Sequence, residues 1–320
     1  MIEKSSRIYV AGHRGLAGSA IVRALNLHGF TSVIYRTHTE LDLTDRAAVR
    51  EFFDRQRPEY VFVAAAKVGG ILANDTYPAD FIRDNLEIQT NVIDASYRIG
   101  VKRLLFLGSS CIYPKLAPQP IKEEYLLTGP LESTNRAYAL AKIAGIEMCW
   151  SYNRQHGTRY LAAMPTNLYG IGDNFDLNAS HVLPALIRKI VEAKASGEKQ
   201  LVVWGTGRPR REFLYSDDLA EACLHLLSLP EEKYGALLNS HDAPLINVGT
   251  GEDLTIEDLA ELIARVLNFA CELVFDTTKQ DGAPQKLLDV SRIHALGWKA
   301  QVSLEEGIRR TYAAFHAGTA

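Results

Sequence analysis

Short apolar segments alternate with longer amphipathic ones along the first half of the chain. The segments 60–66 and 103–108 are almost entirely apolar, as expected of strands buried on both faces of a sheet. The amphipathic segments repeat apolar residues every three to four positions, which predicts helices. Strands are predicted at 7–11, 32–35, 60–66, 103–108 and 159–164, and helices at 19–28, 44–53, 78–97 and 138–156.

This alternation predicts an α/β fold, namely a doubly wound parallel sheet with right-handed crossovers. After Pro165 the alternation is less regular, and 167–180 and 205–211 are predicted to be ligand-facing insertions. A strand at 245–249 is expected to return to the main sheet. The tail is predicted to hold a helix at 255–268, a strand at 272–275 and a helix from 303 onward.

Two interleaved domains follow from this pattern. A large N-terminal domain is expected at 1–170, with 213–252 returning to it. A smaller C-terminal α/β lobe is expected at 171–212 and 253–320. A chain of 320 residues is long enough for about two domains.

Composition and charge narrow the functional classes. The contents of 47% hydrophobic and 23% charged residues are ordinary for a globular protein. A net charge of −3 gives no basic footprint for nucleic acid. No uncharged apolar run approaches ~18 residues, and the N-terminus lacks the apolar core of a signal peptide. We therefore expect a cytoplasmic enzyme that binds neither nucleic acid nor membrane.

The cysteines give no framework for a metal or a disulfide. Cys111, Cys149, Cys223 and Cys271 are far apart, without a C-x-x-C spacing. A reducing compartment also disfavours disulfides. Each cysteine is expected to be a buried apolar residue or a single reactive thiol, and no metal site is predicted.

A glycine-rich turn follows the first predicted strand. It reads Gly12-His13-Arg14-Gly15-Leu16-Ala17-Gly18 and opens the first helix. Gly12 permits a tight turn, Gly15 lets the backbone approach a pyrophosphate, and Gly18 allows close packing of the helix. The helix N-terminus adds free N–H groups. This G-x-x-G-x-x-G spacing suits the short-chain dehydrogenase/reductase branch of the Rossmann fold and predicts a dinucleotide cofactor.

The end of the second strand indicates which dinucleotide binds. NAD enzymes usually carry an acidic residue there, whereas this strand ends in Arg36-Thr37-His38. Arg36 and Arg14 suit the 2′-phosphate of NADP, because a guanidinium pairs with phosphate through two donors. The alternative is a solvated Arg36, with Glu40 binding the ribose. Asp42-Leu43 suits an adenine contact, and Asp42 suits a local helix cap equally well.

A serine, a tyrosine and a lysine have the arrangement of a carbonyl reductase. Tyr138 and Lys142 are four residues apart and share a helix face. Ser109 lies just beyond a strand end, where doubly wound sheets bind ligands. The serine hydroxyl would hold the carbonyl oxygen, the phenol would supply a proton, and the lysine cation is expected to lower the pKa of the phenol. Ser110 is expected to face the cofactor.

Two further residues are ambiguous from their local pattern alone. Cys111 is two residues beyond Ser109 and therefore near the same ligand, but a lone cysteine is more often part of the core. His181 follows a polar loop and precedes an apolar helix, and a lone histidine there is more often a cap or a surface residue.

Several motifs together resemble the GDP-L-fucose synthases, epimerase–reductases of the extended short-chain dehydrogenase/reductases. The resemblance runs nearly end to end, and the S-S-C-I-Y-P and S-H-V motifs are specific within the superfamily. The motifs are Gly12–Gly15, Ala64–Gly70, Leu107–Pro114, Tyr138 with Lys142, Met164–Gly170, Asp173–Phe175, Ser180–Val182 and Arg211–Phe213.

The resemblance implies a two-part reaction on GDP-4-dehydro-6-deoxy-D-mannose. The sugar is epimerised at carbons 3 and 5, and carbon 4 is then reduced by NADPH to give GDP-L-fucose. The 4-keto group acidifies the neighbouring carbons, so an acid/base pair can invert them through an enolate. In the family, the residues matching Cys111 and His181 form this pair, which makes Ser109, Cys111, Tyr138, Lys142 and His181 the predicted catalytic residues.

The resemblance also implies a GDP-sugar site at Lys189, Trp204, Arg211 and Asp281. One departure concerns the substrate: after Tyr169-Gly170 the family often has Pro-His, and this chain has Ile171-Gly172. The predicted NADP(H) contacts beyond the glycine turn are Arg36, His38, Asp42, Leu43, Leu107, Gly108, Ser109, Ser110, Lys142, Pro165, Thr166, Asn167, Leu168 and His181.

Other functions remain as alternatives at this point. They are an enzyme acting on another GDP-4-keto sugar, such as a GDP-L-colitose synthase, a reductase without epimerisation, and a non-catalytic NADP-binding protein. A homodimer through the helices at 78–97 and 138–156 is expected by resemblance. The small residues of the second helix suit close approach there, although they would also suit packing within the chain.

Overall fold

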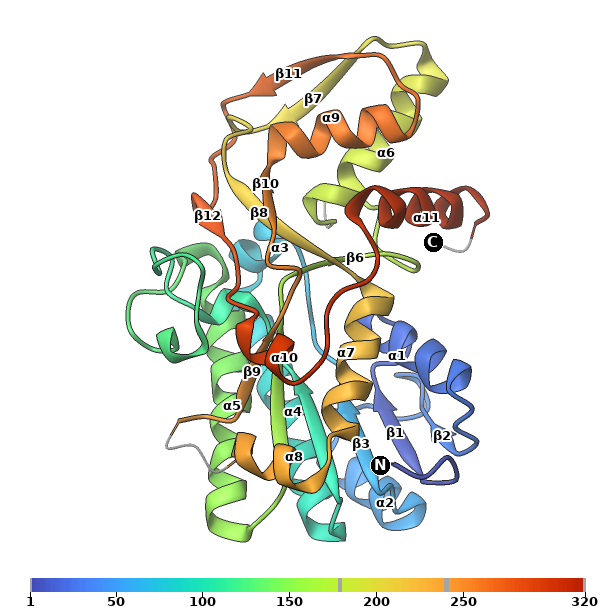
Figure 1. Cartoon of the computed structure of the whole chain (residues 1–320), viewed down its shortest axis with the longest axis vertical. Coiled ribbons are helices and arrows are strands. Elements are labelled where there is room, and N and C mark those ends of the chain that lie inside the picture. Colours follow the sequence, from blue (N-terminus) through green and yellow to red (C-terminus); the bar gives the residue numbers. More distant parts are fainter. Residues whose placement is uncertain (1, 178–179, 239–241, 319–320) are drawn as a thin grey trace.

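The chain folds around a six-stranded parallel sheet, which occupies the lower part of the molecule in Figure 1. This computed structural model describes residues 2–177, 180–238 and 242–318. The strand order β2-β1-β3-β4-β5-β9 confirms the predicted α/β fold with a doubly wound sheet. The strands are β1 (Ile8–Ala11), β2 (Val33–Ile34), β3 (Tyr60–Val63), β4 (Arg103–Leu107), β5 (Tyr160–Pro165) and β9 (Leu245–Val248).

The direction of winding reverses between β1 and β3. From β1 the chain adds β2 on one side and then crosses to β3 on the other side. Ala11 pairs with Val63, so the carboxyl ends of β1 and β3 reach the same edge of the sheet. Doubly wound sheets bind their ligands at such a point.

Helices cover both faces of this sheet (Figure 1). Helix α4 packs along α5, and α1 packs along α7. Asp45 caps α2 by accepting hydrogen bonds from Ala47 N and Ala48 N, and Gly100 ends α4 in the left-handed conformation. The helices are α1 (Leu16–Leu27), α2 (Arg46–Gln56), α4 (Pro78–Ile99), α5 (Arg136–His156), α7 (Ser216–Ser228), α8 (Glu231–Leu238) and α10 (Ser291–Ala295).

The elements predicted for this part agree with the structure to within a few residues, whereas α7, α8 and α10 were not predicted, and two further differences concern α1 and α3. Helix α1 begins at Leu16 rather than Ser19, because Gly15 already serves as its N-cap. The short helix α3 (Ile71–Thr76) was not predicted, because six residues are too few to show a helical repeat.

A second, smaller group of elements lies above the main sheet in Figure 1. Strand β8 is its centre and pairs with β6, β10 and β12, while β7 pairs with β11. The elements are β6 (Asn167–Tyr169), α6 (Val182–Ser196), β7 (Gln200–Trp204), β8 (Arg210–Tyr215), β10 (Asp253–Thr255), α9 (Ile256–Val266), β11 (Glu272–Asp276), β12 (Gln285–Lys286) and α11 (Leu304–His316).

Strand β8 lies between two hydrophobic cores. Leu214 belongs to the core of the main sheet, whereas Phe213 and Tyr215 belong to the core of the second part. Successive side chains of a strand point to opposite faces, so one strand can serve both cores. From the tail, Leu288 and Ile293 pack into the first core. The predicted domain boundaries themselves stay a prediction.

The two predicted ligand-facing insertions contain regular structure. The segment 205–211 leads into β8, and the segment 167–180 begins with β6. Residues 178–179 of the second segment lie outside the described residues. Within the described ranges, no helix is both long and apolar enough to cross a membrane.

Candidate active site

The glycine turn lies at the reversal point of the sheet. Gly12 has φ +86°, and a Cβ there would lie 2.6 Å from Ala65 N. A Cβ on Gly18 would overlap the carbonyl of Gly12, whereas a Cβ on Gly15 would make only an ordinary contact with Gly12 O at 3.5 Å. Gly15 caps α1 without a side chain, so the first N–H groups of the helix keep no intrahelical acceptor. The residues present therefore fit the diphosphate of a dinucleotide.

Cationic side chains lie beside this turn. Arg14 is exposed, and the Arg36 guanidinium lies 5.5 Å from the centre of the Phe52 ring. His13 stacks on Tyr35 with ring centres 4.6 Å apart, and burial, together with Arg14, lowers the pKa of His13. The Arg36 guanidinium, which lies over an aromatic ring, and the exposed Arg14 together suit a phosphate monoester.

The carboxylates near these arginines are engaged in their own loops. Glu40 accepts hydrogen bonds from Thr37 N and Thr37 Oγ1, both at 2.8 Å, and these bonds lower the pKa of Glu40. Asp42 accepts from Thr44 N at 2.9 Å and Thr44 Oγ1 at 2.8 Å. The N-cap of the next helix is Asp45, so Asp42 shapes the turn before the cap.

Two further predicted cofactor residues near Asp42, His38 and Leu43, differ in exposure. His38 is exposed and lies 3.8 Å from the Asp42 carboxylate. Leu43 is partly buried and packs against the first hydrophobic core. Their contacts with a cofactor stay a prediction.

The remaining predicted cofactor residues lie at the ends of β4 and β5. These two strands are adjacent and parallel, so their ends meet at one edge of the sheet. Leu107 ends β4, Gly108 follows it, Ser110 is buried in the short helix η1 (Ser110–Ile112), Pro165 ends β5, Thr166 is the next residue, and Asn167 and Leu168 begin β6.

The structure brings the predicted serine, tyrosine and lysine to this edge. Ser109 caps η1, and Tyr138 and Lys142 lie on the first turns of α5, which packs against η1. Lys142 is 3% exposed, and its Nζ donates to Leu107 O at 2.8 Å. The same Nζ lies 5.8 Å from the centre of the Tyr138 ring.

The pKa of the Tyr138 phenol shifts in the direction opposite to the expected one. Burial raises the pKa of Tyr138, and the neighbouring Cys111 charge raises it further. Burial also lowers the pKa of Lys142 to about 8. For both groups the cost of removal from water is the largest cause of the shift. The phenol keeps its proton at neutral pH, as a proton donor must.

Cys111 belongs to the same cluster. It is 6% exposed, and Ser109 Oγ accepts a hydrogen bond from its backbone N at 3.4 Å. Burial raises the pKa of the thiol, and Lys286, the Ser109 hydroxyl and Lys142 lower it by smaller amounts. A thiol thus lies among the groups of a carbonyl reductase. Lys286 was missed because nothing in its local pattern marks it.

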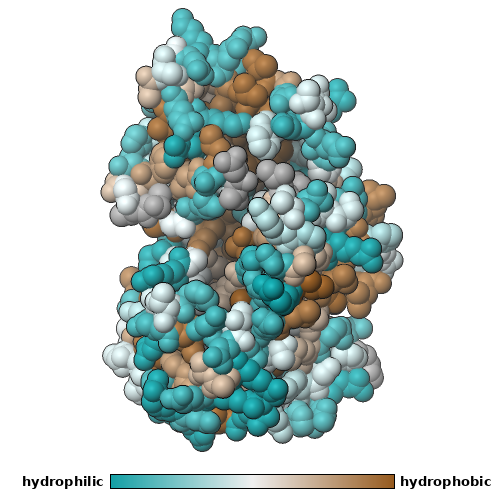
Figure 2. Space-filling model, turned by 180° about the vertical axis from the view of Figure 1, so that it is seen from behind, coloured by the Kyte–Doolittle hydropathy of each residue, from teal (hydrophilic) through white to brown (hydrophobic). Residues whose placement is uncertain are grey.

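His181 comes from the second part of the molecule. It is the N-cap residue of α6 and has an exposed side chain, yet the surrounding protein lowers its pKa. A side chain that is exposed and still surrounded by protein atoms, as His181 is, is typical of the wall of an open cleft. Figure 2 shows a hollow between the two parts of the molecule. Among the described residues, no hydrogen bond or ion pair joins His181 to Cys111.

Three of the four predicted substrate residues lie near the last residue of β7 or the first residues of β8. Trp204 ends β7 and is 52% exposed, and Lys189 Nζ lies 5.0 Å from its ring centre. Arg211 Nη1 donates to Ala283 O at 2.7 Å, and burial lowers the pKa of Arg211. An exposed indole with cations nearby suits a nucleotide, and the held guanidinium suits a diphosphate.

The fourth predicted substrate residue, Asp281, already has partners. Its carboxylate accepts hydrogen bonds from Thr206 N at 3.0 Å and Thr206 Oγ1 at 2.6 Å. Its charge also acts on Arg211. Asp281 therefore shapes the turn between β7 and β8, and its contact with a substrate stays a prediction.

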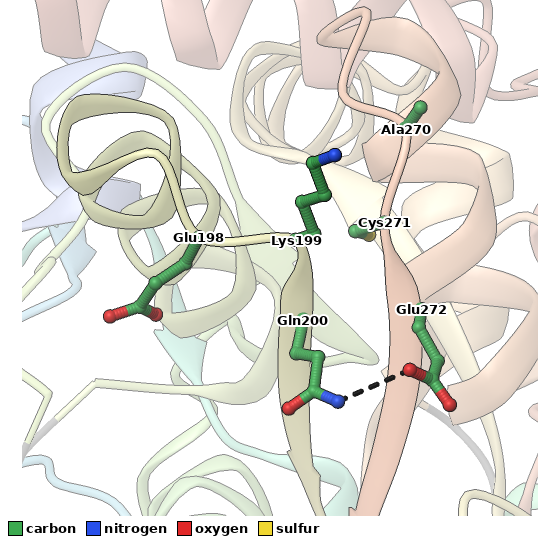
Figure 3. Close-up of a pocket in the computed structure, with 6 residues that line it drawn as sticks. All are labelled: Glu198, Lys199, Gln200, Ala270, Cys271 and Glu272. Carbon is green, nitrogen blue, oxygen red and sulfur yellow. Dashed lines mark hydrogen bonds between the residues drawn. The ribbon is translucent and has the colours of Figure 1, made fainter.

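A separate depression lies at the far end of the second part (Figure 3). It is lined by residues at the starts of β7 and β11, at the opposite end of β7 from Trp204. Gln200 Nε2 donates to Glu272 Oε2 at 3.1 Å across it. Its lining contains none of the predicted site residues. In the described part of the chain, no three His, Cys, Asp or Glu side chains are placed to hold a metal ion.

A doubly wound sheet with a glycine turn at its reversal point and a Ser–Tyr–Lys cluster at its strand ends defines a nicotinamide-dependent oxidoreductase of the short-chain type. A family model agrees with this class over residues 8–239. The chain belongs to the NAD dependent epimerase/dehydratase family.

Individual relatives are similar over nearly the whole chain. The chain is 56% identical to GDP-L-fucose synthase 1 of Arabidopsis thaliana, covering 98% of this chain and 94% of the relative. It is 53% identical to GDP-L-fucose synthase of Escherichia coli (strain K12), covering 96% and 95%. GDP-L-colitose synthase of Yersinia pseudotuberculosis is 36% identical over 95% of this chain and 96% of the relative.

A solved structure supports the same relationship. The GDP-D-glycero-L-gluco-heptose synthase of Campylobacter jejuni, determined in the presence of NADPH, superposes with a TM-score of 0.91. It is 38% identical and covers 99% of this chain and 100% of that chain.

Proposed function

We propose that the protein converts GDP-4-dehydro-6-deoxy-D-mannose to GDP-L-fucose. The single observation that carries this proposal is the Cys111 thiol, which lies among Ser109, Tyr138 and Lys142. A reductase alone needs no such group, whereas epimerisation next to a ketone also needs an acid/base residue that reaches the carbons beside the carbonyl. The 53% and 56% identity to GDP-L-fucose synthases, against 36% to a colitose synthase, favours this substrate.

NADPH, when bound, supplies the hydride for carbon 4. The glycine turn Gly12–Gly18 and the N-terminus of α1 hold the diphosphate through backbone N–H groups. Arg14 and Arg36 bind the 2′-phosphate, which distinguishes NADP from NAD. The engagement of Glu40 by Thr37 supports the arginines over Glu40 as the residues that select the dinucleotide.

Epimerisation uses the acidity of the carbons beside the ketone. One member of the Cys111–His181 pair removes the proton at carbon 3 or 5, and the electron pair moves to the carbonyl oxygen to give an enolate. The other member returns a proton to the opposite face. Ser109 and Tyr138 donate hydrogen bonds to the enolate oxygen, which stabilises the charge that forms there.

Reduction uses the same oxygen site. As hydride reaches carbon 4, the oxygen gains a negative charge and takes the phenolic proton of Tyr138. Lys142 places a positive charge beside the tyrosinate that is left. Arg211 binds the GDP diphosphate, Lys189 and Trp204 bind the nucleotide end, and Asp281 orients the turn beside them.

The test is a reaction in deuterated water with NADPH and GDP-4-dehydro-6-deoxy-D-mannose. We expect oxidation of NADPH, deuterium at carbons 3 and 5, and GDP-L-fucose as the product by NMR. A reduced product without deuterium at either carbon would show a simple reductase. Binding of NADPH without turnover of this sugar or of its 3-deoxy analogue would favour a non-catalytic function.

A cytoplasmic homodimer is part of the proposal. The small residues Ala141 and Gly145 of α5 are already used within the chain, because Ala141 O accepts from Gln89 Nε2 and a Cβ on Gly145 would overlap Phe106. The proposed dimer interface is formed instead by exposed residues of α4 and α5, including Tyr97 and Leu140. A monomeric mass by light scattering at micromolar concentration would contradict it.

A further inference from the structure

Glu212 is a fully buried carboxylate on β8 with no exposed surface. Its Oε1 accepts hydrogen bonds from Thr250 N at 2.6 Å and Gly251 N at 2.8 Å, and its Oε2 accepts from Leu288 N at 2.9 Å. Burial raises the pKa of Glu212, and these N–H donors lower it. No cation within 4.0 Å pairs with it in the described part of the chain, so backbone dipoles hold this carboxylate.

The side chain fits closely between the segments that it joins. A Cβ on Gly249 would overlap the Glu212 carboxylate, so a larger residue there would displace the carboxylate from its hydrogen bonds. The carboxylate thereby ties the turn between β9 and β10 to β8 and to the end of β12. A hydrogen-bonded group packed this tightly transmits its position to its neighbours.

The main chain of Glu212 reaches a third segment. Its carbonyl oxygen accepts hydrogen bonds from Thr166 Oγ1 at 3.1 Å and Asn167 Nδ2 at 2.8 Å. These residues connect β5 to β6 and are predicted to contact the cofactor. Glu212 therefore bonds at the same time to the main-sheet side and to the substrate side of the molecule.

Strands β8 and β12 carry the cations of the substrate side. Arg211 directly precedes Glu212 on β8. Lys286 on β12 is the register partner of Arg211. The Arg211 guanidinium is held by Ala283 O just before β12, and the charge of Lys286 acts on Cys111. A shift of β12 against β8 would therefore move the groups that bind the diphosphate and face the thiol.

We propose that Glu212 is a positioning residue that fixes the substrate-binding strand pair β8–β12 against the cofactor segment Thr166–Asn167. This inference rests on the proposed function. It explains how carbon 4, held by the second part, meets a hydride donor held by the main sheet. Hydride transfer needs reacting atoms about 3–3.5 Å apart, whereas a proton can reach an acid/base group directly or through one water.

The testing variant is Glu212→Gln, which keeps the shape but replaces one acceptor oxygen by a donor. We expect the ratio of deuterium exchange at carbons 3 and 5 to NADPH oxidation to rise about 10- to 100-fold. We expect the Kd for GDP, measured by calorimetry, to weaken about fivefold or more, because Arg211 shifts with β8. The Kd for NADPH should stay within about twofold.

The matched control is Glu123→Gln. Glu123 is also a buried carboxylate and accepts from Asn247 N at 3.0 Å, but it ties a loop to β9. A loss of folded protein lowers exchange and reduction equally, so this control should leave the ratio unchanged. If Glu212→Gln does not fold, Thr166→Val removes only the hydroxyl that donates to Glu212 O and should raise the ratio in the same direction.

Two results separate this inference from the proposed function. Equal losses of exchange and reduction in the folded Glu212→Gln protein, with unchanged GDP affinity, would make Glu212 merely structural and overturn the inference. If the wild-type protein neither exchanges deuterium nor oxidises NADPH with the sugar, the proposed function fails. Weaker GDP binding by the variant would then still support the positioning role.

Discussion

The two halves of the candidate site are built in different ways. Ser109, Cys111, Tyr138 and Lys142 come from the end of β4 and the start of α5, which pack against each other in one hydrophobic core. His181 comes from the start of α6, whose apolar side belongs to the second core. The first group is positioned within one sheet, while the second depends on how the two parts of the molecule meet.

This difference shows which catalytic groups depend on the junction between the parts. The phenol, the ammonium and the thiol keep their mutual geometry as long as α5 packs on β4. The imidazole reaches the same ligand only while β6 and β8 hold the two parts in register. Proton donation in reduction should therefore depend on groups of the first half alone, whereas complete epimerisation should need acid/base groups from both halves. The junction between the parts also sets the distance over which hydride reaches carbon 4, so reduction depends on the junction as well.

The largest expected effect tests the first half directly. Tyr138→Phe removes the phenolic proton and keeps the ring that packs against Phe81, at 6.5 Å between ring centres. We expect reduction to slow by about 10²–10⁴-fold, because general-acid assistance is lost. NADPH binding, measured by fluorescence, should stay nearly intact. More than half of the wild-type turnover would remove Tyr138 from the mechanism.

The next effect separates the two chemistries. In Cys111→Ser the hydroxyl is nearly the size of the thiol but far less acidic, so it is a poor base at neutral pH. We expect deuterium exchange at carbons 3 and 5 to slow by about 10²-fold or more. Hydride transfer and the Tyr138 proton are untouched, so part of the product should be the unepimerised 4-hydroxy sugar.

The control for this experiment is Cys149→Ser. Cys149 is also buried but lies on the core side of α5, so its substitution should lower stability without changing the product. If Cys111→Ser exchanges deuterium at the wild-type rate and yields only the epimerised product, Cys111 is a packing residue. The base would then have to be sought in the second half, at His181 first.

A smaller effect concerns the cofactor end of the first half. Arg36→Ala should weaken NADPH about 10- to 150-fold and leave NADH nearly unchanged, because one charge-assisted bond to the 2′-phosphate is lost. Glu40→Gln is the matched variant for the alternative reading and should change both cofactors little. Equal weakening of NADPH and NADH by Arg36→Ala would show that Arg36 does not read the phosphate.

The main sheet could be predicted from the sequence more fully than the junction between the two parts. The inner strands of the main sheet follow from runs of apolar residues, because parallel strands there are buried on both faces, whereas the edge strand β2 is only partly buried. The strand β8 carries Arg210, Arg211 and Glu212, whose polar groups are satisfied by partners far away in the chain. No local pattern reveals such partners, and the segment therefore reads as a loop.

The candidate site divides in a similar way. Tyr138 and Lys142 are four residues apart on one helix face, so their proximity follows from local geometry, and Ser109 lies just beyond the end of β4, where ligands of doubly wound sheets bind. Lys286 and Glu212 gain their places only through the pairing of β12 with β8. The shifted pKa of Tyr138 was predicted in the wrong direction, because burial depends on tertiary packing that the spacing of two residues does not contain.

The smallest expected effect is on stability, and it measures the free-energy cost of burying Lys142 in the first half of the site. Burial lowers the pKa of Lys142 from 10.5 to about 8, so between these pH values the unfolded chain binds more protons than the folded one. The free energy of unfolding must then rise with pH in this window. Relative to Lys142→Met, wild type should gain about 1.4 kcal/mol for each pH unit from 8 to about 10.5, measured by urea unfolding.

A control with the opposite sign makes this last prediction specific. The pKa of Lys67 is raised by its hydrogen bond to Asp84, so its contribution is fully present below the unfolded pKa and is lost as pH rises above it. Wild type should therefore lose stability relative to Lys67→Met at the alkaline end. If the Lys142 difference is flat from pH 8 to 10, the ammonium is hydrated in the folded protein. The first half of the site would then be more open to water than its packing indicates.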